Sequence, residues 1–186
     1  MAGLLALVVA IAVLGGRGPL SFTGLNAVPQ QYRPWITKAG SQCSQITSAV
    51  IAAQLYQESG FNPAAVSPTG ARGIAQFEPE SFARSGRDET GRGVASPDDP
   101  ADAIMAQGRY MCALARQAQH SGLPGDPVAL ALAGYNAGWG AVEKYRGIPP
   151  YPETRHYVRC ILALAQHKSG ATHPRTSAFR VGSGSS

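Results

Sequence analysis

Two Asp-Pro pairs constrain the fold of this chain more than any other feature of its sequence. Asp99-Pro100 and Asp126-Pro127 each precede a stretch in which apolar residues recur at three- and four-residue steps. An Asp side chain accepts hydrogen bonds from the free N–H groups at a helix start, and a Pro in the first turn removes no helical hydrogen bond. The pairs therefore predict one helix from residue 100 to Gly122 and another from residue 127 through Leu132.

The same periodicity predicts three further helices. The first has Ser44 as its N-cap and ends at Gly60, the second is short and covers 139–145, and the last runs from about Pro152 toward Gly170. No segment shows the period-two alternation that is typical of a strand. The chain is therefore predicted to be all-α, with a loop-rich region at 61–97.

The first residues are predicted to direct export. Residues 4–14 form a nearly unbroken apolar run, which has the length of a signal-peptide core and is short for a bilayer span. No Lys or Arg precedes the run and no clear cleavage site follows it, so 1–18 are interpreted as either a signal peptide or an uncleaved membrane anchor. Both alternatives place the protein in the cell envelope or outside the cell.

Composition divides the remainder of the chain. Residues 19–39 are rich in Gly, Pro, Gln and Ser and are predicted to be a linker. Residues 169–186 end in Gly-Ser-Gly-Ser-Ser and are predicted to be a disordered tail, because such a composition cannot form a core. One folded domain is thus expected at 40–168.

The net charge of the chain limits the kinds of molecule that it could bind. The formal net charge is +5 and the isoelectric point about 9.4, which suits an acidic polymer such as nucleic acid, an anionic membrane surface or a cell wall. The cations are scattered and not interleaved with aromatic residues, which argues against nucleic acid.

The three cysteines include no Cys-x-x-Cys pair, so a zinc site is not expected. In an exported protein we expect one disulfide, Cys43–Cys112, with Cys160 left as a thiol.

Glu58 is the first candidate for chemistry, in the segment Gln57-Glu58-Ser59-Gly60-Phe61-Asn62-Pro63. A carboxylate at a helix C-terminus lies near the negative end of the helix dipole, which disfavours its charged form. Desolvation by the neighbouring Tyr56 and Phe61 would raise its pKa further, as a general acid requires. Taken alone, a solvated Glu at a helix end is the commoner case.

Three more segments accompany Glu58: Ser67-Pro68-Thr69-Gly70-Ala71-Arg72-Gly73-Ile74-Ala75-Gln76-Phe77, Gly134-Tyr135-Asn136-Ala137-Gly138 and Pro152-Glu153-Thr154-Arg155-His156-Tyr157-Val158. In this order and spacing the four segments resemble the soluble lytic transglycosylase family of the lysozyme-like superfamily, over about residues 43–165. The resemblance implies a lysozyme-like helical domain with a substrate cleft. It also implies Glu58 as the catalytic acid, with the following substrate-binding residues: Ser59, Ser67, Gln76, Tyr135, Asn136, Glu153 and Tyr157. Gly134 departs from the family's usual Ala, and Ala75 from the common Met.

The resemblance further implies a reaction. Glu58 would protonate the oxygen between N-acetylmuramic acid and N-acetylglucosamine in peptidoglycan, and the C6 hydroxyl of the muramyl sugar would then close a 1,6-anhydro ring. No cofactor is implied. The loop Asp88–Gly93 lacks the spaced carboxylates of a calcium site, so no metal is expected.

Other functions are compatible with the same residues. Glu78 or Glu80 could act as a second catalytic carboxylate beside Glu58, although the simpler interpretation is that both are solvated charges on a loop. The alternatives for the whole protein are a goose-type-lysozyme-like hydrolase and a non-catalytic wall-binding or assembly protein. Wall remodelling, a secretion or conjugation machine as partner, and a phage context all fit the sequence equally well.

Overall fold

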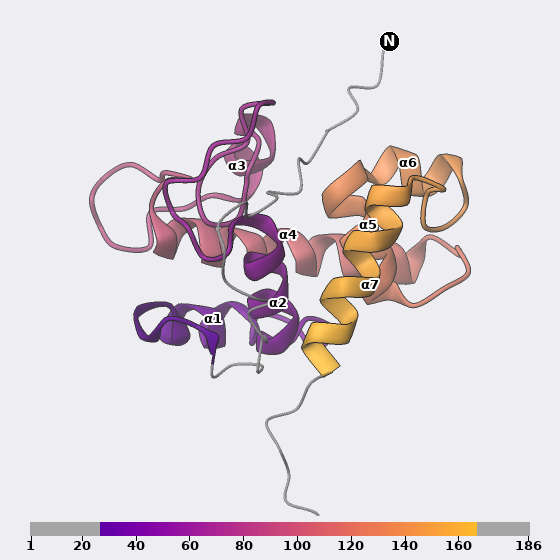
Figure 1. Ribbon diagram of the computed structural model, residues 1–186, viewed down its shortest axis with the longest axis horizontal. Coiled ribbons are helices and arrows are strands. Elements are labelled where there is room, and N and C mark those ends of the chain that lie inside the picture. The colour runs from indigo at the N-terminus through magenta and orange to yellow at the C-terminus, as the bar shows by residue number, and fades with distance from the viewer. Residues whose placement is uncertain (1–26, 167–186) are drawn as a thin grey trace, which may run out of the picture.

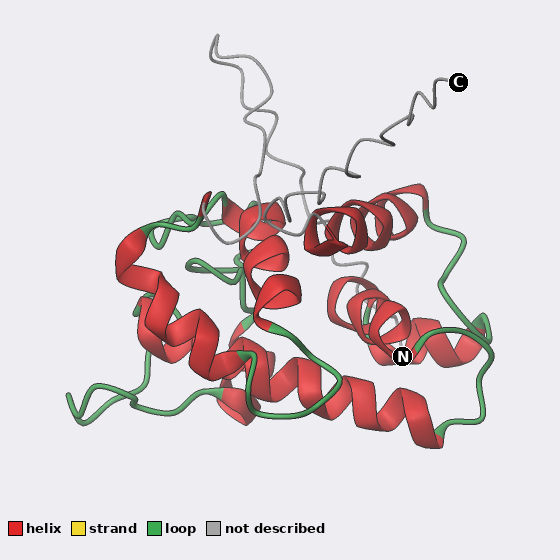
Figure 2. Cartoon of the chain, turned by 90° about the horizontal axis from the view of Figure 1, so that it is seen from below, coloured by secondary structure: helices red, strands yellow, loops and turns green. Residues whose placement is uncertain are grey.

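The computed structural model describes residues 27–166, and within that range the chain is helical and has no strand (Figures 1 and 2). Two isolated bridges, Val66 with Arg72 and Arg72 with Phe77, are its only β-type pairings there. The all-α prediction is confirmed. The predicted signal or anchor segment at 1–18 and the predicted tail at 169–186 lie outside the described residues.

The described range contains one short 3-10 helix and seven α-helices. In chain order they are η2 (Gln30–Tyr32), α1 (Arg33–Ala39), α2 (Ser48–Ser59), α3 (Pro79–Ser85), α4 (Pro100–His120), α5 (Pro127–Ala137), α6 (Trp139–Lys144) and α7 (Pro152–Gln166).

The two Asp-Pro helix starts form as predicted. The side chain of Asp99 accepts a hydrogen bond of 2.9 Å from the Asp102 amide, and that of Asp126 accepts one of 2.9 Å from Ala129. The predicted N-cap Ser44 is wrong, because α2 begins after Thr47, whose hydroxyl accepts from the Val50 amide at 3.3 Å. Helix α3, which has only seven residues, is not among the predicted helices.

The predicted linker at 19–39 is wrong for its last part. Residues 30–39 form η2 and α1, and α1 packs against α2 and α4. Tyr32, Ile36 and Ala39 recur at three- and four-residue steps and are all buried, so they give this segment an apolar face despite its polar composition. The folded domain therefore begins well before residue 40.

The long helix α4 organises the domain. It contacts α1, α3 and α5, while α2 contacts α7 and α5 contacts both α6 and α7. In Figure 1 the loops around α3 lie on one side of α2, and α5 to α7 lie on the other. The last turn of α2 therefore faces both halves of the domain.

The disulfide prediction is confirmed. Cys43 and Cys112 are bonded with their Cα atoms 6.0 Å apart, which ties the segment before α2 to the middle of α4, and Cys160 is a free thiol.

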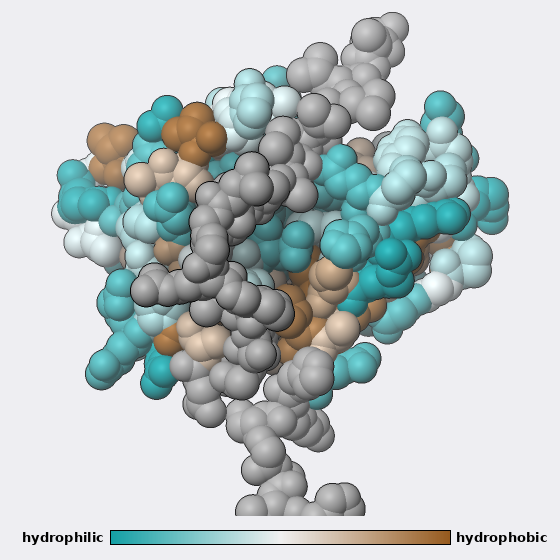
Figure 3. Space-filling view, viewed as in Figure 1, coloured by the Kyte–Doolittle hydropathy of each residue, from teal (hydrophilic) through white to brown (hydrophobic). Residues whose placement is uncertain are grey.

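The surface gives no sign of a membrane-spanning helix in the described part. None of the helices at 27–166 combines the length and apolar character needed to cross a bilayer. On the face drawn in Figure 3, hydrophilic residues predominate and hydrophobic ones gather in small separate groups.

Candidate active site

The carboxyl group of Glu58 is buried in the last turn of α2. The helix ends at Gly60, which adopts the left-handed conformation with φ 62°, so the chain turns sharply away directly after the acid. Glu58 is only 5% exposed. Burial raises the pKa of Glu58 from 4.5 to about 8, so the side chain holds its proton at neutral pH. The direction agrees with the sequence-based expectation.

Tyr157 of α7 donates a short hydrogen bond to Oε1 of Glu58. This bond partly opposes the rise in the pKa of Glu58, because it stabilises the carboxylate form. The Tyr157 hydroxyl in turn accepts from Nε2 of Gln54, one helical turn before Glu58, at 3.0 Å. Burial raises the pKa of Tyr157 well above its usual range, so its hydroxyl remains a donor. The acid is therefore oriented from one side by a fixed donor.

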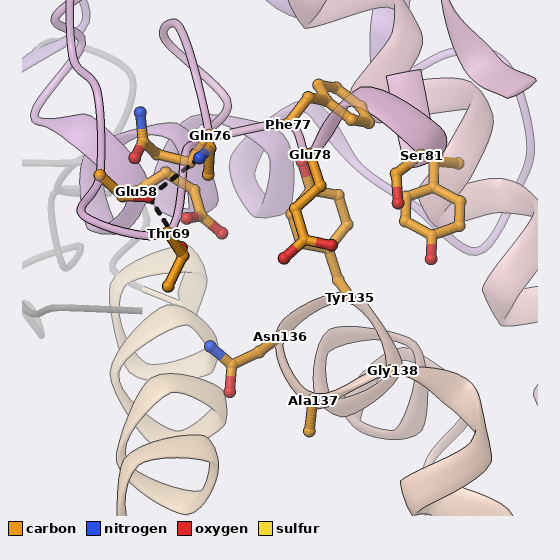
Figure 4. A pocket seen from close by; sticks show the side chains of 13 residues that line it. Glu58, Thr69, Gln76, Phe77, Glu78, Ser81, Tyr135, Asn136, Ala137 and Gly138 are labelled. Atoms are coloured by element: carbon orange, nitrogen blue, oxygen red, sulfur yellow. Dashed lines mark hydrogen bonds between the residues drawn. The ribbon is translucent and has the colours of Figure 1, made fainter. Parts of the chain in front are cut away.

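Glu58 also lines a pocket of about 140 Å³ (Figure 4). Its walls come from the loop after α2, from α3, from the middle of α4 and from the end of α5. The lining residues are Glu58, Ser67, Thr69, Ala71, Gln76, Phe77, Glu78, Ser81, Tyr110, Tyr135, Asn136, Ala137 and Gly138. Figure 4 shows Thr69 and Gln76 on the loop side, facing Asn136 and Ala137 of α5.

A compact turn gives the loop wall its shape. Gly73 has a φ of 76°, and a Cβ atom there would lie 1.9 Å from the carbonyl oxygen of Pro97, so only glycine fits. Gln76 also has a positive φ, 49°, and its Nε2 donates to the carbonyls of Ala65 at 3.1 Å and Gly73 at 2.9 Å. The amide donors of Gln76 thus hold the loop, and its Oε1 is left as the polar atom for a ligand.

The opposite wall presents a buried donor. Asn136 is 5% exposed, and its Oδ1 accepts from the Thr154 hydroxyl at 2.7 Å. Its Nδ2 is buried and has no hydrogen-bond partner among the described residues. An unpaired buried N–H costs free energy in the empty site, which indicates a position built for a ligand acceptor. Tyr135 beside it donates to the Ala75 carbonyl at 2.8 Å and presents its ring to the pocket.

Five of the residues named from the sequence line one pocket, and three lie outside its lining. Glu58, Ser67, Gln76, Tyr135 and Asn136 line one pocket. Three others do not line it: Ser59 donates to the Ile74 carbonyl at 2.7 Å and so fastens the loop to α2, Tyr157 lies behind the acid, and Glu153 stands at the start of α7.

Sequence reasoning missed several lining residues. Ser81 and Tyr110 carry no signal in a single sequence, because only folding brings α3 and α4 to the pocket. Thr69 lies within the segment quoted from the sequence but was not named as a site residue. Glu78, weighed earlier as a second carboxylate, does line the pocket, whereas Glu80 does not. Within residues 27–166 no group of three or more His, Cys, Asp or Glu side chains could hold a metal ion.

Comparisons with known proteins agree with this geometry. The sequence model of a family described as the transglycosylase SLT domain matches residues 35–158. Proteins named membrane-bound lytic murein transglycosylase F are similar in sequence. The one from Pseudoalteromonas translucida is 33% identical over 117 residues, which cover 62% of this chain and 23% of that protein. The one from Serratia proteamaculans is 36% identical over 97 residues, 52% of this chain and 18% of that protein.

Solved structures give the same match. The 70-kDa soluble lytic transglycosylase from Escherichia coli superposes with a TM-score of 0.60 and 26% identity, over 75% of this chain and 24% of that one. Its complex with bulgecin A gives a TM-score of 0.59 with the same identity and coverage. The chain spans about a quarter of the length of these relatives.

Proposed function

Because the chain belongs to the transglycosylase SLT domain family, we propose that it is a lytic transglycosylase that cleaves the glycan strands of peptidoglycan. The relatives' names, lytic murein transglycosylase and soluble lytic transglycosylase, support this activity. The observation that carries the proposal is the state of Glu58: a buried carboxyl, protonated at neutral pH, at the bottom of a pocket lined by amide side chains.

In the first step Glu58 acts as a general acid. Its proton passes to the oxygen that links C1 of N-acetylmuramic acid to N-acetylglucosamine, and the C1–O bond breaks. The new carboxylate receives the hydrogen bond of Tyr157, so its negative charge meets a preorganised donor as it forms. Positive charge that develops on the muramyl ring is met by the acetamide of that sugar.

In the second step the same group acts as a base. The carboxylate of Glu58 takes the proton of the C6 hydroxyl of the muramyl sugar, and O6 bonds to C1. A 1,6-anhydro end results, Glu58 is protonated again, and no water is consumed. Because the nucleophile belongs to the substrate, its effective concentration is high and no second carboxylate is needed.

The two walls of the pocket would hold the muramyl sugar. Nδ2 of Asn136 is the free donor for the acetamide oxygen, and Oε1 of Gln76 is the free acceptor for an N–H or O–H. Tyr135 supplies a ring surface on the same side as Asn136. We place the enzyme in the cell envelope, which agrees with relatives named as membrane-bound.

The proposal is tested by product analysis on purified peptidoglycan. Wild type is expected to release fragments with anhydro ends, which are one water lighter in mass spectrometry than the reducing ends of hydrolysis. Glu58→Gln, which can still accept the Tyr157 hydrogen bond, is expected to keep the fold and to lose cleavage by a factor of about 10³ or more. Reducing ends would indicate a hydrolase, and cleavage retained in Glu58→Gln would remove Glu58 from its role.

A further inference from the structure

A second hollow, of about 500 Å³, lies next to the proposed glycan pocket and is lined by four arginines. Arg109 and Arg116 stand seven residues apart on one face of α4, Arg84 is in the last turn of α3, and Arg87 follows that helix. The other lining residues are Gln42, Ser85, Tyr110, Cys112 and Ala113, so the lining contains no acidic side chain. We call this cavity the arginine hollow.

The positive charge of the arginine hollow is mostly uncompensated. Arg109 pairs with Glu89 at 2.7 Å and donates from Nε to the Ser85 carbonyl at 2.7 Å, while its Nη2 is buried and has no partner in the described part of the chain. No ion pair forms between Arg84, Arg87 or Arg116 and any residue of 27–166. Like charges gathered without counter-ions disfavour the empty state, and an anionic ligand would relieve this.

The arginine hollow adjoins the pocket at Glu58, which we call the glycan pocket. Tyr110 of α4 lines both, and α3 contributes Ser81 to the pocket at Glu58 and Arg84 to the hollow. A polymer lying against Glu58 would therefore pass or reach the arginines with its neighbouring units. The glycan pocket offers amide and aromatic groups that suit neutral sugars, whereas the arginine hollow suits a part of the same polymer that is charged.

We propose that the arginine hollow binds a carboxylate of the peptide branches of peptidoglycan, which rests on the proposed function. The sugar hydroxyls and acetamides of a peptidoglycan strand are neutral, and its fixed negative charge comes from the carboxylates of the peptides attached to the muramyl units. An arginine fork binds a carboxylate through two parallel hydrogen bonds, which suits this ligand. The enzyme would thereby prefer strands that still carry their peptides.

The test measures binding without cleavage, in the Glu58→Gln background. Two ligands are compared: soluble peptidoglycan strands freed of phosphate polymers, and the same strands after an amidase has removed their peptides. The peptide-bearing strands are expected to bind roughly tenfold more tightly, as one or two charge-assisted contacts would give. In a variant that also carries Arg84→Gln and Arg116→Gln, most of this difference in affinity is expected to disappear.

A matched control removes the same charge elsewhere. Arg146→Gln with Arg159→Gln, in exposed positions that line neither pocket, is expected to keep the preference. Released peptides added in excess should lower the affinity for peptide-bearing strands to that for peptide-free strands, a measurement that needs no arginine variant.

The proposal would be overturned by equal binding of the two strands, by loss of the ratio in both double variants alike, or by a lack of competition from the peptides. A preference that appears only when phosphate polymers are left on the strands would assign the arginine hollow to phosphate instead and would equally refute the peptide assignment. Failure of the proposed function is seen separately, as wild-type enzyme that binds these strands but does not cleave them.

Discussion

Glu58→Gln should stabilise the protein, and the gain should grow with pH. In the folded state burial raises the pKa of Glu58 to about 8, whereas in the unfolded chain the carboxyl has its ordinary pKa of 4.5. Glutamine has nearly the same shape and retains an acceptor for Tyr157, but it has no ionisation to suppress. The variant therefore isolates the free energy that folding spends on keeping this carboxyl protonated.

The sign and size follow from the two pKa values. Below pH 4.5 the carboxyl is protonated in both the folded and the unfolded state, so wild type loses no stability by keeping Glu58 protonated. As pH rises the unfolded chain ionises first, so the free energy of unfolding falls until pH passes about 8. A shift from 4.5 to about 8 corresponds to roughly 5 kcal/mol above pH 8 and about 3 kcal/mol at pH 7.

Urea unfolding of wild type and Glu58→Gln between pH 4 and 8 measures this difference. The stability gap between the two proteins should widen steadily with pH over this range. Glu80→Gln removes an exposed carboxyl of α3 and should follow the wild-type curve. Parallel curves for wild type and Glu58→Gln would mean that Glu58 ionises freely in the folded protein, and the assignment of a protonated acid would fail.

Other substitutions test the surroundings of the acid. Tyr157→Phe removes the hydrogen bond that lowers the pKa of Glu58, so the alkaline limb of the pH–rate profile should move upward and kcat should fall about tenfold or more; an unmoved limb would contradict the role of Tyr157. Gly73→Ala should destabilise the domain by more than about 2 kcal/mol in urea unfolding and should reduce cleavage. Gly91→Ala, at the same φ of 76° but in open space, should lose stability only through backbone strain, and equal losses would refute the proposed close contact at Gly73. Replacing Cys43 and Cys112 by Ser opens a loop of 69 residues and should lower the free energy of unfolding by about 4 kcal/mol, and no loss under non-reducing conditions would show that the bond does not form.

The helices that a single sequence predicts well are those with local start signals. Asp99 and Asp126 cap their helices within three residues, so the information lies inside the segment itself. The start of α2 is misplaced by the sequence because Ser44 and Thr47 are both residue types that cap helices, and only the structure shows that Thr47 is the cap. Segment 30–39 was misread because its polar composition obscured a buried face that only the packing against α4 makes evident.

The raised pKa of Glu58 was predictable from the sequence, whereas its hydrogen bond to Tyr157 was not. Glu58 lies at a helix end beside aromatic residues, and burial raises its pKa in the direction that this position predicts. Tyr157 is 99 residues away, so its hydrogen bond to the acid could be assigned only from the fold. Gln76 is predicted to bind substrate through its amide, and the structure adds that the amide donors hold the loop by bonding the carbonyls of Ala65 and Gly73.

The burial of Glu58 lowers the stability of the fold and supports the proposed activity. Glu58 is costly to the fold because it is desolvated, and desolvation is also what keeps it protonated as an acid at pH 7. The unpaired Nδ2 of Asn136 adds a further cost on the facing wall. A substitution that admits water to the pocket should therefore lower the pKa of Glu58, raise the stability at pH 8 and reduce the cleavage rate first on the alkaline side. If variants selected for stability at pH 8 kept the full rate at that pH, the burial of Glu58 would not be what makes it an acid.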